Sequence, residues 1–137
     1  MLPNGILFVD KAEGWTSHDV VARSRRALGT KKVGHAGTLD PMATGLLTLG
    51  AGPATRLLTY MVGLDKTYVT TIRLGATTVT DDREGDLLEL ADPEVLARVD
   101  ADAIAPAAAP LTGAIMQPPR AVSASKVDGK RAHDQAR

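Results

Sequence analysis

Five glycines fall within the nineteen residues from Gly34 to Gly52, which read GHAGTLDPMATGLLTLGAG. Glycine reaches backbone angles that other residues avoid, so this stretch allows tight turns and a close approach of a ligand to the backbone. Within it Asp40 precedes Pro41, and the residue before a proline is disfavoured in helical geometry. We therefore expect an irregular loop that exposes Asp40 and leads into a buried strand at Leu46–Leu49.

The residues before this segment predict a strand followed by a helix. Gly5–Asp10 is a short apolar run after a turn signal, which is typical of a strand. A helix is expected to begin at Thr16 or Ser17, either of which can cap it, and to end at Gly29. Its buried stripe is expected to consist of residues at three- and four-residue steps, namely Val20, Val21, Ser24, Ala27 and Leu28.

The residues after the segment continue the mixture of helix and strand. Pro53 begins a helix that runs through Met61, and the alternating, β-branched run Lys66–Leu74 predicts a strand. A polar, turn-rich stretch at 77–86 precedes a helical pattern from Pro93 to about Ile104. Beyond it we expect an Ala/Pro connector at 105–110, a strand at Ser123–Val127, a turn at 128–129 and the start of a helix at Lys130–Arg137. This order indicates an α/β or α+β sheet protein.

Composition narrows the class of protein. At 137 residues the chain has the length of one domain, and its four aromatic residues require a mainly aliphatic core. Cysteine is absent, which excludes disulfides, thiolate metal sites and cysteine nucleophiles and suits a cytoplasmic protein. The first residues lack the pattern of a signal peptide, and the apolar runs are shorter than a membrane span requires. We expect a soluble, cytoplasmic protein.

The charges are unevenly distributed although their sum is zero. Residues 1–73 carry a balance of +4, residues 74–106 carry −7 and residues 107–137 carry +3. No acidic residue occurs from Val20 through Leu39, a stretch that holds Arg23, Arg25, Arg26, Lys31 and Lys32. Such a basic stretch can face phosphate groups, with Arg23 and Lys32 as candidates for contact with an RNA backbone. The alternative is a solvated helix face, and the charges alone favour this alternative.

The candidate for chemistry is the carboxylate of Asp40, on a Gly/Pro loop beside His35. It suits a nucleophile or a general base, but a turn aspartate that bonds its own loop amides is the commoner case and is favoured by chemistry alone. The glycines do not form a Walker loop, since no Gly-Lys-Ser/Thr follows at the required spacing. The three histidines lack the spacing of a zinc site, so no metal is expected.

The segment GHAGTLDPMATGLL resembles the signature of the TruB family of tRNA pseudouridine synthases and of their guide-RNA-dependent relatives in archaea and eukaryotes. Five further blocks resemble the family in the same order. They are GILFVDKAEGWTSHDVV, GPATRLLTYM, DKTYVTTIRLG, TTVTDDREGD and PPRAVSASKVDGKRAHDQAR. The resemblance implies a pseudouridine synthase fold, with a mixed and mainly antiparallel sheet flanked by helices.

The resemblance also implies roles for single residues. Asp40 matches the catalytic aspartate, His35 a histidine that contacts the T loop of tRNA, and Tyr68 a tyrosine that stacks on the flipped uracil. Alternatively His35 is a turn residue and Tyr68 a half-buried strand aromatic. Lys66 either reaches the site or ends its strand. Lys126, with Lys130 and Arg131, matches a segment that grips RNA, although exposed lysines are usually only solvated.

The implied activity is the isomerisation of uridine-55 in the T loop of tRNA to pseudouridine, without a cofactor. The expected partner is the T arm of tRNA, with no membrane or protein partner and a monomeric full-length enzyme.

Ala12, Val122 and His133 depart from the family's usual residues. The family's catalytic domain continues past Arg137 and is followed by a C-terminal RNA-binding domain, so residues 1–137 are expected to form the N-terminal portion of an incomplete catalytic domain that is inactive alone. The alternatives are a guide-RNA-dependent relative and a non-catalytic tRNA-binding or RNA-folding module.

Overall fold

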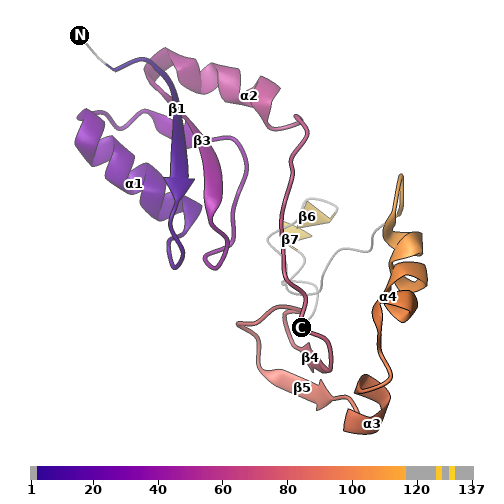
Figure 1. The fold of residues 1–137 in the computed structure, drawn as a ribbon. Helices are drawn as coiled ribbons and strands as arrows, with labels where there is room; N and C mark the ends of the chain where they lie inside the picture. The colour runs from indigo at the N-terminus through magenta and orange to yellow at the C-terminus, as the bar shows by residue number, and fades with distance from the viewer. Residues whose placement is uncertain (1–2, 117–125, 128–129, 132–137) are drawn as a thin grey trace. The chain divides into compact units, whose positions relative to one another are not determined.

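The structure, a computed structural model, describes residues 3–116, 126–127 and 130–131 (Figure 1). The chain divides into two compact units, Met1–Tyr68 and Val69–Arg137. Both units contain antiparallel strands and helices, so the expected mixed α/β class is confirmed. None of the helices in the described ranges has the length and apolar character that a membrane span requires.

The first unit is built on a three-stranded antiparallel sheet with the order β1-β3-β2. Its strands are β1 (Gly5–Lys11), β2 (Val33–His35) and β3 (Gly45–Ala51). The central strand β3 pairs with β1 along its whole length and with β2 at its far end, where His35 lies opposite Leu49. The predicted strands at Gly5–Asp10 and Leu46–Leu49 are confirmed, whereas β2 was not predicted because three residues with a central glycine carry no strand pattern.

Helix α1 (Ser17–Leu28) follows β1 and has the predicted caps. Thr16 is the N-cap residue and forms a capping box with Asp19, in which each side chain accepts a hydrogen bond from the other residue's backbone N–H. Gly29 ends the helix in the left-handed region, with φ of 60°, where a residue without Cβ is least strained. These local signals explain why both ends of the helix were predictable from sequence.

One face of the sheet packs against α1 and forms an aliphatic core. The buried cluster consists of Val20, Val21, Val33, Leu47, Leu49 and Ala51. Successive residues of a strand point to opposite faces, so Leu46 is 67% exposed while Leu47 is buried. The expectation of a fully buried strand at Leu46–Leu49 is therefore wrong for its alternate residues. On α1, Leu28 is partly buried against this cluster, whereas the partly buried Ser24 and the exposed Ala27 line an open cavity between the helix and β1.

The predicted helix from Pro53 to Met61 is present but begins as a 3-10 helix. It consists of η1 (Gly52–Leu57) and α2 (Leu58–Met61). This segment packs closely on β3 at Gly50, where an added Cβ would lie 3.0 Å from the carbonyl oxygen of Ala54 and 3.1 Å from Cγ of Leu58. A side chain at Gly50 would therefore push the helical segment away from the sheet.

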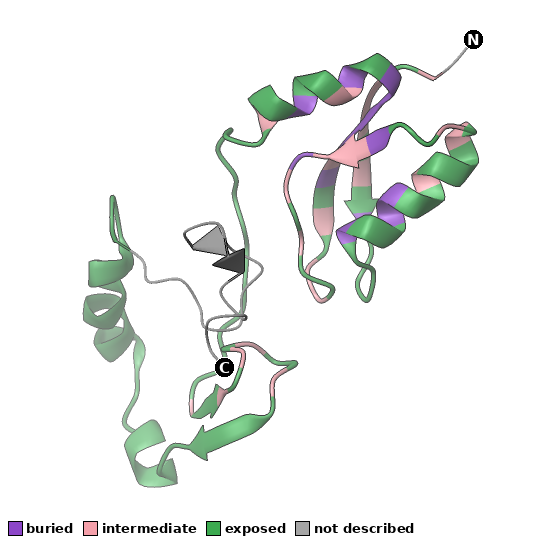
Figure 2. Cartoon of the chain, turned by 180° about the vertical axis from the view of Figure 1, so that it is seen from behind, coloured by how far each residue is buried: buried purple, intermediate pink, exposed green. Residues whose placement is uncertain are grey.

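The second unit contains short elements and no buried residue within 69–116 (Figure 2). Strand β4 (Ala76–Thr78) pairs with β5 (Leu87–Leu90) in an antiparallel hairpin. The helices that follow are α3 (Pro93–Leu96), α4 (Ala101–Ala108) and η2 (Ala109–Leu111). A second antiparallel pair joins β6 (Lys126–Val127) to β7 (Lys130–Arg131).

The largest error of the sequence prediction is the strand at Lys66–Leu74, which has no regular secondary structure. Its alternating, β-branched pattern suits a strand, but none of the described strands pairs with it, and an unpaired strand leaves its backbone N–H and C=O groups without partners. The boundary between the two units, at Tyr68, falls within this run.

Smaller errors lie in the second unit. The helical pattern from Pro93 to Ile104 is divided into α3 and α4, because the side chain of Asp100 accepts a hydrogen bond from the N–H of Ala103 and starts a new helix. The Ala/Pro connector is itself helical and lies in α4 and η2. Lys130–Arg131 is a strand and not the start of a helix, and Lys126–Val127 is a strand as predicted. The rest of the predicted Ser123–Val127 strand, the 128–129 turn and residues 132–137 lie outside the described residues.

Candidate functional site

The loop between β2 and β3 carries Asp40 at its exposed tip. The carbonyl oxygen of Asp40 accepts a hydrogen bond from the N–H of Ala43 at 3.0 Å, which forms a tight turn around Pro41. Among the described residues, no side chain or backbone amide bonds the Asp40 carboxylate, so it is not the self-bonded turn aspartate that chemistry alone favoured. The residue is exposed, so a substrate can approach its carboxylate.

A buried lysine holds the loop next to this carboxylate. Lys11, at the end of β1, is only 1% exposed. Its Nζ donates to the carbonyl oxygens of Trp15 at 2.6 Å, of Ala12 at 3.1 Å and of Pro41 at 3.1 Å. An ammonium group has three donors and no acceptor, and here each donor has a carbonyl partner. A buried charge without such partners would be strongly destabilising, so this arrangement fixes the backbone of Pro41 to the β1–α1 turn.

A buried serine holds the residue on the other side of Asp40. Ser17, the first residue of α1, is 1% exposed. Its hydroxyl donates to the carbonyl oxygen of Leu39 at 3.3 Å and accepts from the N–H of Leu39 at 3.0 Å. In addition, the N–H of Gly14 donates to the carbonyl of Pro41 at 2.8 Å. Both neighbours of Asp40 are therefore anchored while its side chain extends outward, which restricts where the carboxylate can move.

His35 lies at the start of the same loop and is half buried. Its Nδ1 pairs with the carbonyl oxygen of Gly37, and its ring makes an edge-on contact with the ring of His18, with 5.7 Å between the centroids. A carbonyl can only accept, so Nδ1 must carry a proton, and in the neutral ring Nε2 is then the acceptor nitrogen. The loop and helix α1 thus set both the tautomer and the orientation of this side chain.

Lys66 lies near the loop, whereas the structure does not bring Tyr68 to it. The Nζ of Lys66 donates to the carbonyls of Val62 at 2.7 Å and Leu64 at 2.9 Å, and its Cε lies 3.8 Å from the position that a Cβ on Gly37 would occupy. Tyr68 is 65% exposed in the irregular run that was expected to be a strand. Within the described residues, no interaction links Tyr68 to the carboxylate of Asp40.

The other candidate RNA contacts, Arg23, Lys32 and Lys126, belong to other elements than this loop. Arg23 is exposed on α1, with its guanidinium carbon 5.8 Å from the ring centroid of Trp15. Lys32 is exposed in the connection to β2. Lys126 belongs to β6 in the second unit, so no geometry relates it to Asp40.

The sequence reasoning missed Lys11 and Ser17 as residues that shape the site. Lys11 alternates with its neighbours along β1 in the same way as Leu7 and Val9, so the three side chains point to the same, inner face of the sheet. This alternation is the one sequence signal that places the Lys11 side chain inside. Groups of three or more His, Cys, Asp or Glu side chains suited to a metal ion are not found in the part of the chain that the structure describes.

Comparisons with known proteins agree with the resemblance. The family model described as TruB family pseudouridylate synthase (N terminal domain) matches residues 25–137. A protein of Leifsonia xyli named tRNA pseudouridine synthase B is 64% identical over all 137 residues, which cover 45% of its length. Proteins of the same name from Paenarthrobacter aurescens and Thermobifida fusca are 58% and 54% identical, with 98% and 99% of this chain and 42% and 45% of their lengths covered.

The chain therefore spans less than half the length of these curated relatives. Among solved structures, one titled "Structure of H/ACA RNP bound to a substrate RNA containing 2'-deoxyuridine" matches with a TM-score of 0.40 and 43% sequence identity. The match covers 41% of this chain and 18% of that one.

Proposed function

The chain belongs to the TruB family of pseudouridylate synthases, and we propose that it supplies the catalytic loop of an enzyme that converts uridine in tRNA to pseudouridine. The names of the bacterial relatives, at 54–64% identity over nearly the whole chain, support tRNA as the substrate. The observation that carries the proposal is the anchored loop, which fixes both neighbours of Asp40 and leaves its carboxylate exposed.

We assign to Asp40 the role of catalytic carboxylate. The reaction breaks the N-glycosidic bond of a uridine, rotates the uracil and rejoins it to the ribose through carbon, with no cofactor required. The base must first leave its stack, which costs a few kcal/mol and is offset by stacking and edge contacts in the pocket. A carboxylate suits the first step as a nucleophile or as a base, and pre-positioning it lowers the entropy cost of that step.

His35 and Tyr68 are proposed to contact the RNA around this uridine. The ring of His35 is oriented by Gly37 and His18, so Nε2 can accept a hydrogen bond from RNA at a defined position. Tyr68 is exposed at the boundary of the two units, where its ring is accessible for stacking on a flipped base. For Tyr68 the support is the resemblance and its exposure, and not a contact with Asp40.

The target is proposed to be uridine-55 in the T loop, and the basic residues are proposed to contact the RNA backbone. These residues are Arg23, Lys32, Lys66 and Lys126, all cationic, and the first three are exposed. Phosphate contacts of this kind position the RNA but carry no sequence information. We further propose that residues 1–137 form the N-terminal portion of the catalytic domain of a cytoplasmic enzyme that acts as a monomer.

A guide-RNA-dependent enzyme is the second candidate function, because its family signature is nearly the same. The turn between β4 and β5 favours the stand-alone type, since its Thr/Asp-rich sequence resembles the bacterial enzymes. This turn is ordered by Asp82, whose carbonyl accepts from Thr78 Oγ1 at 2.7 Å and whose carboxylate accepts from Thr80 Oγ1 at 2.6 Å. A non-catalytic tRNA-binding module is the third candidate.

Turnover on a bare tRNA transcript distinguishes the three candidate functions. The complete gene product, incubated with an unmodified transcript and no other RNA, is expected to produce pseudouridine at one T-loop uridine, detected as a chemical adduct that stops reverse transcription. A transcript with cytidine at that position is the matched control and should give no stop. Conversion only after a guide RNA is added would favour the second candidate, and binding without conversion would favour the third.

A further inference from the structure

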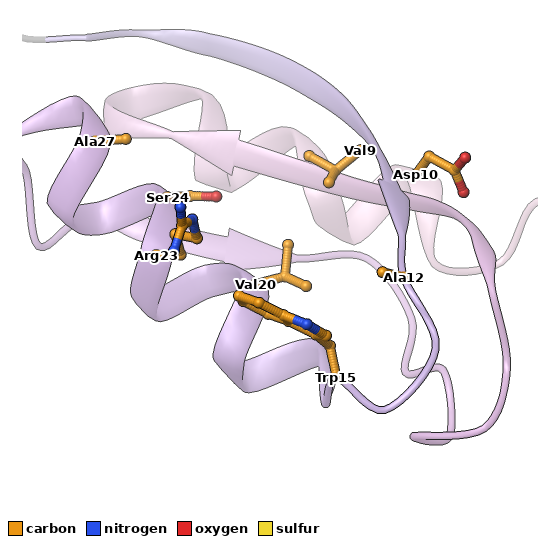
Figure 3. Close-up of a pocket in the computed structure, with 8 residues that line it drawn as sticks. All are labelled: Val9, Asp10, Ala12, Trp15, Val20, Arg23, Ser24 and Ala27. Atoms are coloured by element: carbon orange, nitrogen blue, oxygen red, sulfur yellow. The ribbon is translucent and has the colours of Figure 1, made fainter.

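A cavity of about 270 Å³ opens between β1 and α1, on the side of the helix that the core does not fill (Figure 3). Its walls come from both elements and from the turn between them, and they include Val9, Asp10, Trp15, Val20 and Arg23. The volume lies just below the roughly 300–1,000 Å³ of ordinary small-molecule sites, so it suits one planar ring system and not a larger ligand.

Trp15 is the central side chain of this region. It is exposed, although tryptophan is the largest apolar side chain in the chain, and it borders a second opening beside Asp19 and Arg26. The guanidinium of Arg23 lies over the indole ring at 5.8 Å from its centroid. Figure 3 shows the indole of Trp15 below Val20 and Arg23 in this view. An aromatic ring next to a guanidinium is the combination on which nucleobases stack.

The charges around the cavity favour an anionic occupant. Trp15 borders both openings, with Arg23 at the first and Arg26 at the second. The stretch from Val20 through Leu39 has no acidic residue. Two acidic residues also lie at the rim. The carboxylate of Asp10 points away from the helix in Figure 3, and that of Asp19 is held by the N–H and hydroxyl of Thr16 at 2.9 Å and 2.6 Å.

Trp15 and the Asp40 loop are joined through one buried atom. The Nζ of Lys11 bonds the carbonyl of Trp15 and also the carbonyl of Pro41, which directly follows Asp40. Lys11 therefore ties the backbone of Trp15, whose side chain lines the cavity, to the loop that carries Asp40. An RNA bound at Asp40 can extend to this cavity.

We propose that this cavity binds one unpaired nucleobase of the RNA substrate, stacked on Trp15, with the adjoining phosphate at Arg23. The inference rests on the proposed function, and it adds a second base contact outside the uridine site. This contact contributes to RNA affinity and orientation and takes no part in the chemical step. It predicts that loss of the indole changes binding while the rate at saturating RNA stays the same.

The test uses the complete gene product and an unmodified tRNA transcript. Trp15→Leu keeps an apolar side chain but removes the stacking surface, so its Kd for tRNA is expected to rise about tenfold, which corresponds to one lost stacked base. Trp15→Phe should retain most of the affinity, and kcat should be unchanged in both variants. Tyr60→Leu, which removes another exposed aromatic side chain of the same unit, is the matched control and should bind like the wild type.

A second readout needs only the wild type and the conservative variant Trp15→Phe. Trp15 is the only tryptophan of this chain, so the emission that Trp15→Phe lacks reports on this site alone. Acrylamide should quench that emission without RNA, and bound tRNA should both quench it and protect it from acrylamide. Emission that acrylamide cannot reach before RNA is added would mean that another part of the protein fills the cavity, which overturns the proposal.

An unchanged Kd for Trp15→Leu, or Trp15 emission that tRNA leaves unaffected, would also overturn it. Either result with normal pseudouridine formation removes the second base contact and leaves the proposed function standing. A wild-type protein that forms no pseudouridine would instead remove the proposed function.

Discussion

The described parts of the two units differ in whether their apolar side chains are buried. In the first unit, apolar residues of β1, β3 and α1 meet across one face of the sheet and exclude water. In the second unit, Leu87, Leu88 and Leu90 of β5 are all more than half exposed, and no residue within 69–116 is buried. A two-stranded hairpin without a packed face is marginally stable in water. The loop that carries Asp40 belongs to the first unit, which contains the buried aliphatic cluster.

This difference shows what a site of this kind requires. A carboxylate on an exposed loop keeps its position only if the backbone beside it is fixed, and the fixing groups, Lys11 and Ser17, project from β1 and α1. Both elements are immobilised by the aliphatic core behind them. Elements with few buried contacts open at low free-energy cost, so they are poor supports for a pre-positioned group.

The largest expected effect is the loss of a core side chain in the first unit. Leu49 is completely buried at the centre of β3, so Leu49→Ala should lower the free energy of unfolding by about 2–5 kcal/mol. Leu88→Ala, at an exposed position of β5, should change it by less than about 0.5 kcal/mol. Urea titration of the complete gene product measures both. Equal effects of the two substitutions would show that the second unit has a core of comparable importance.

A smaller effect is expected from the buried ammonium group. Lys11→Met removes the donor to three carbonyls and leaves them unsatisfied, which should cost about 1–3 kcal/mol of unfolding free energy. Pseudouridine formation should fall further than tRNA binding, because the Pro41 backbone beside Asp40 loses its anchor. Lys31→Met, at an exposed lysine, is the control for stability. Full activity of Lys11→Met would show that the loop holds its geometry without this clamp.

The smallest effect concerns the cap of α1 and depends on pH. Hydrogen bonds from the side chain and the backbone of Thr16 lower the pKa of Asp19 below its usual 3.8. A lowered pKa in the folded state stabilises the protein above the unfolded value, and this contribution is lost as pH falls through the folded value. Asp19→Asn should therefore lower the unfolding midpoint at pH 7 but have little effect once the pH has fallen below the folded-state pKa of Asp19. Asp92→Asn, at the cap of the unpacked helix α3, should shift the midpoint less at neutral pH.

The same contrast explains how much of the fold was predictable. Signals that act over a few residues, such as the Thr16–Asp19 cap and the glycine at position 29, predicted the ends of α1 correctly. The short apolar run of Gly5–Asp10 predicted β1 correctly, and a partner strand is present to pair with it. The equally clear pattern of Lys66–Leu74 failed, since alternation says which face is apolar and not whether a partner strand exists.

The candidate site was predictable only where local sequence patterns determine it. Glycines and Pro41 predicted an exposed loop at Asp40, and His35 lies at the start of the same loop. Lys11 bonds a residue 30 positions away and Ser17 a residue 22 positions away, and no local pattern encodes such contacts. The roles of His35, Tyr68 and the basic residues remain predictions, as does the function of Asp40.

The most direct test of the account is Asp40→Asn in the complete gene product, assayed for both pseudouridine formation and tRNA binding. The substitution keeps the size of the side chain and the anchored backbone of Leu39 and Pro41, and removes only the negative charge. We expect pseudouridine formation to be abolished while the Kd for tRNA changes by no more than a few fold. Pseudouridine formed at the wild-type rate would contradict the account.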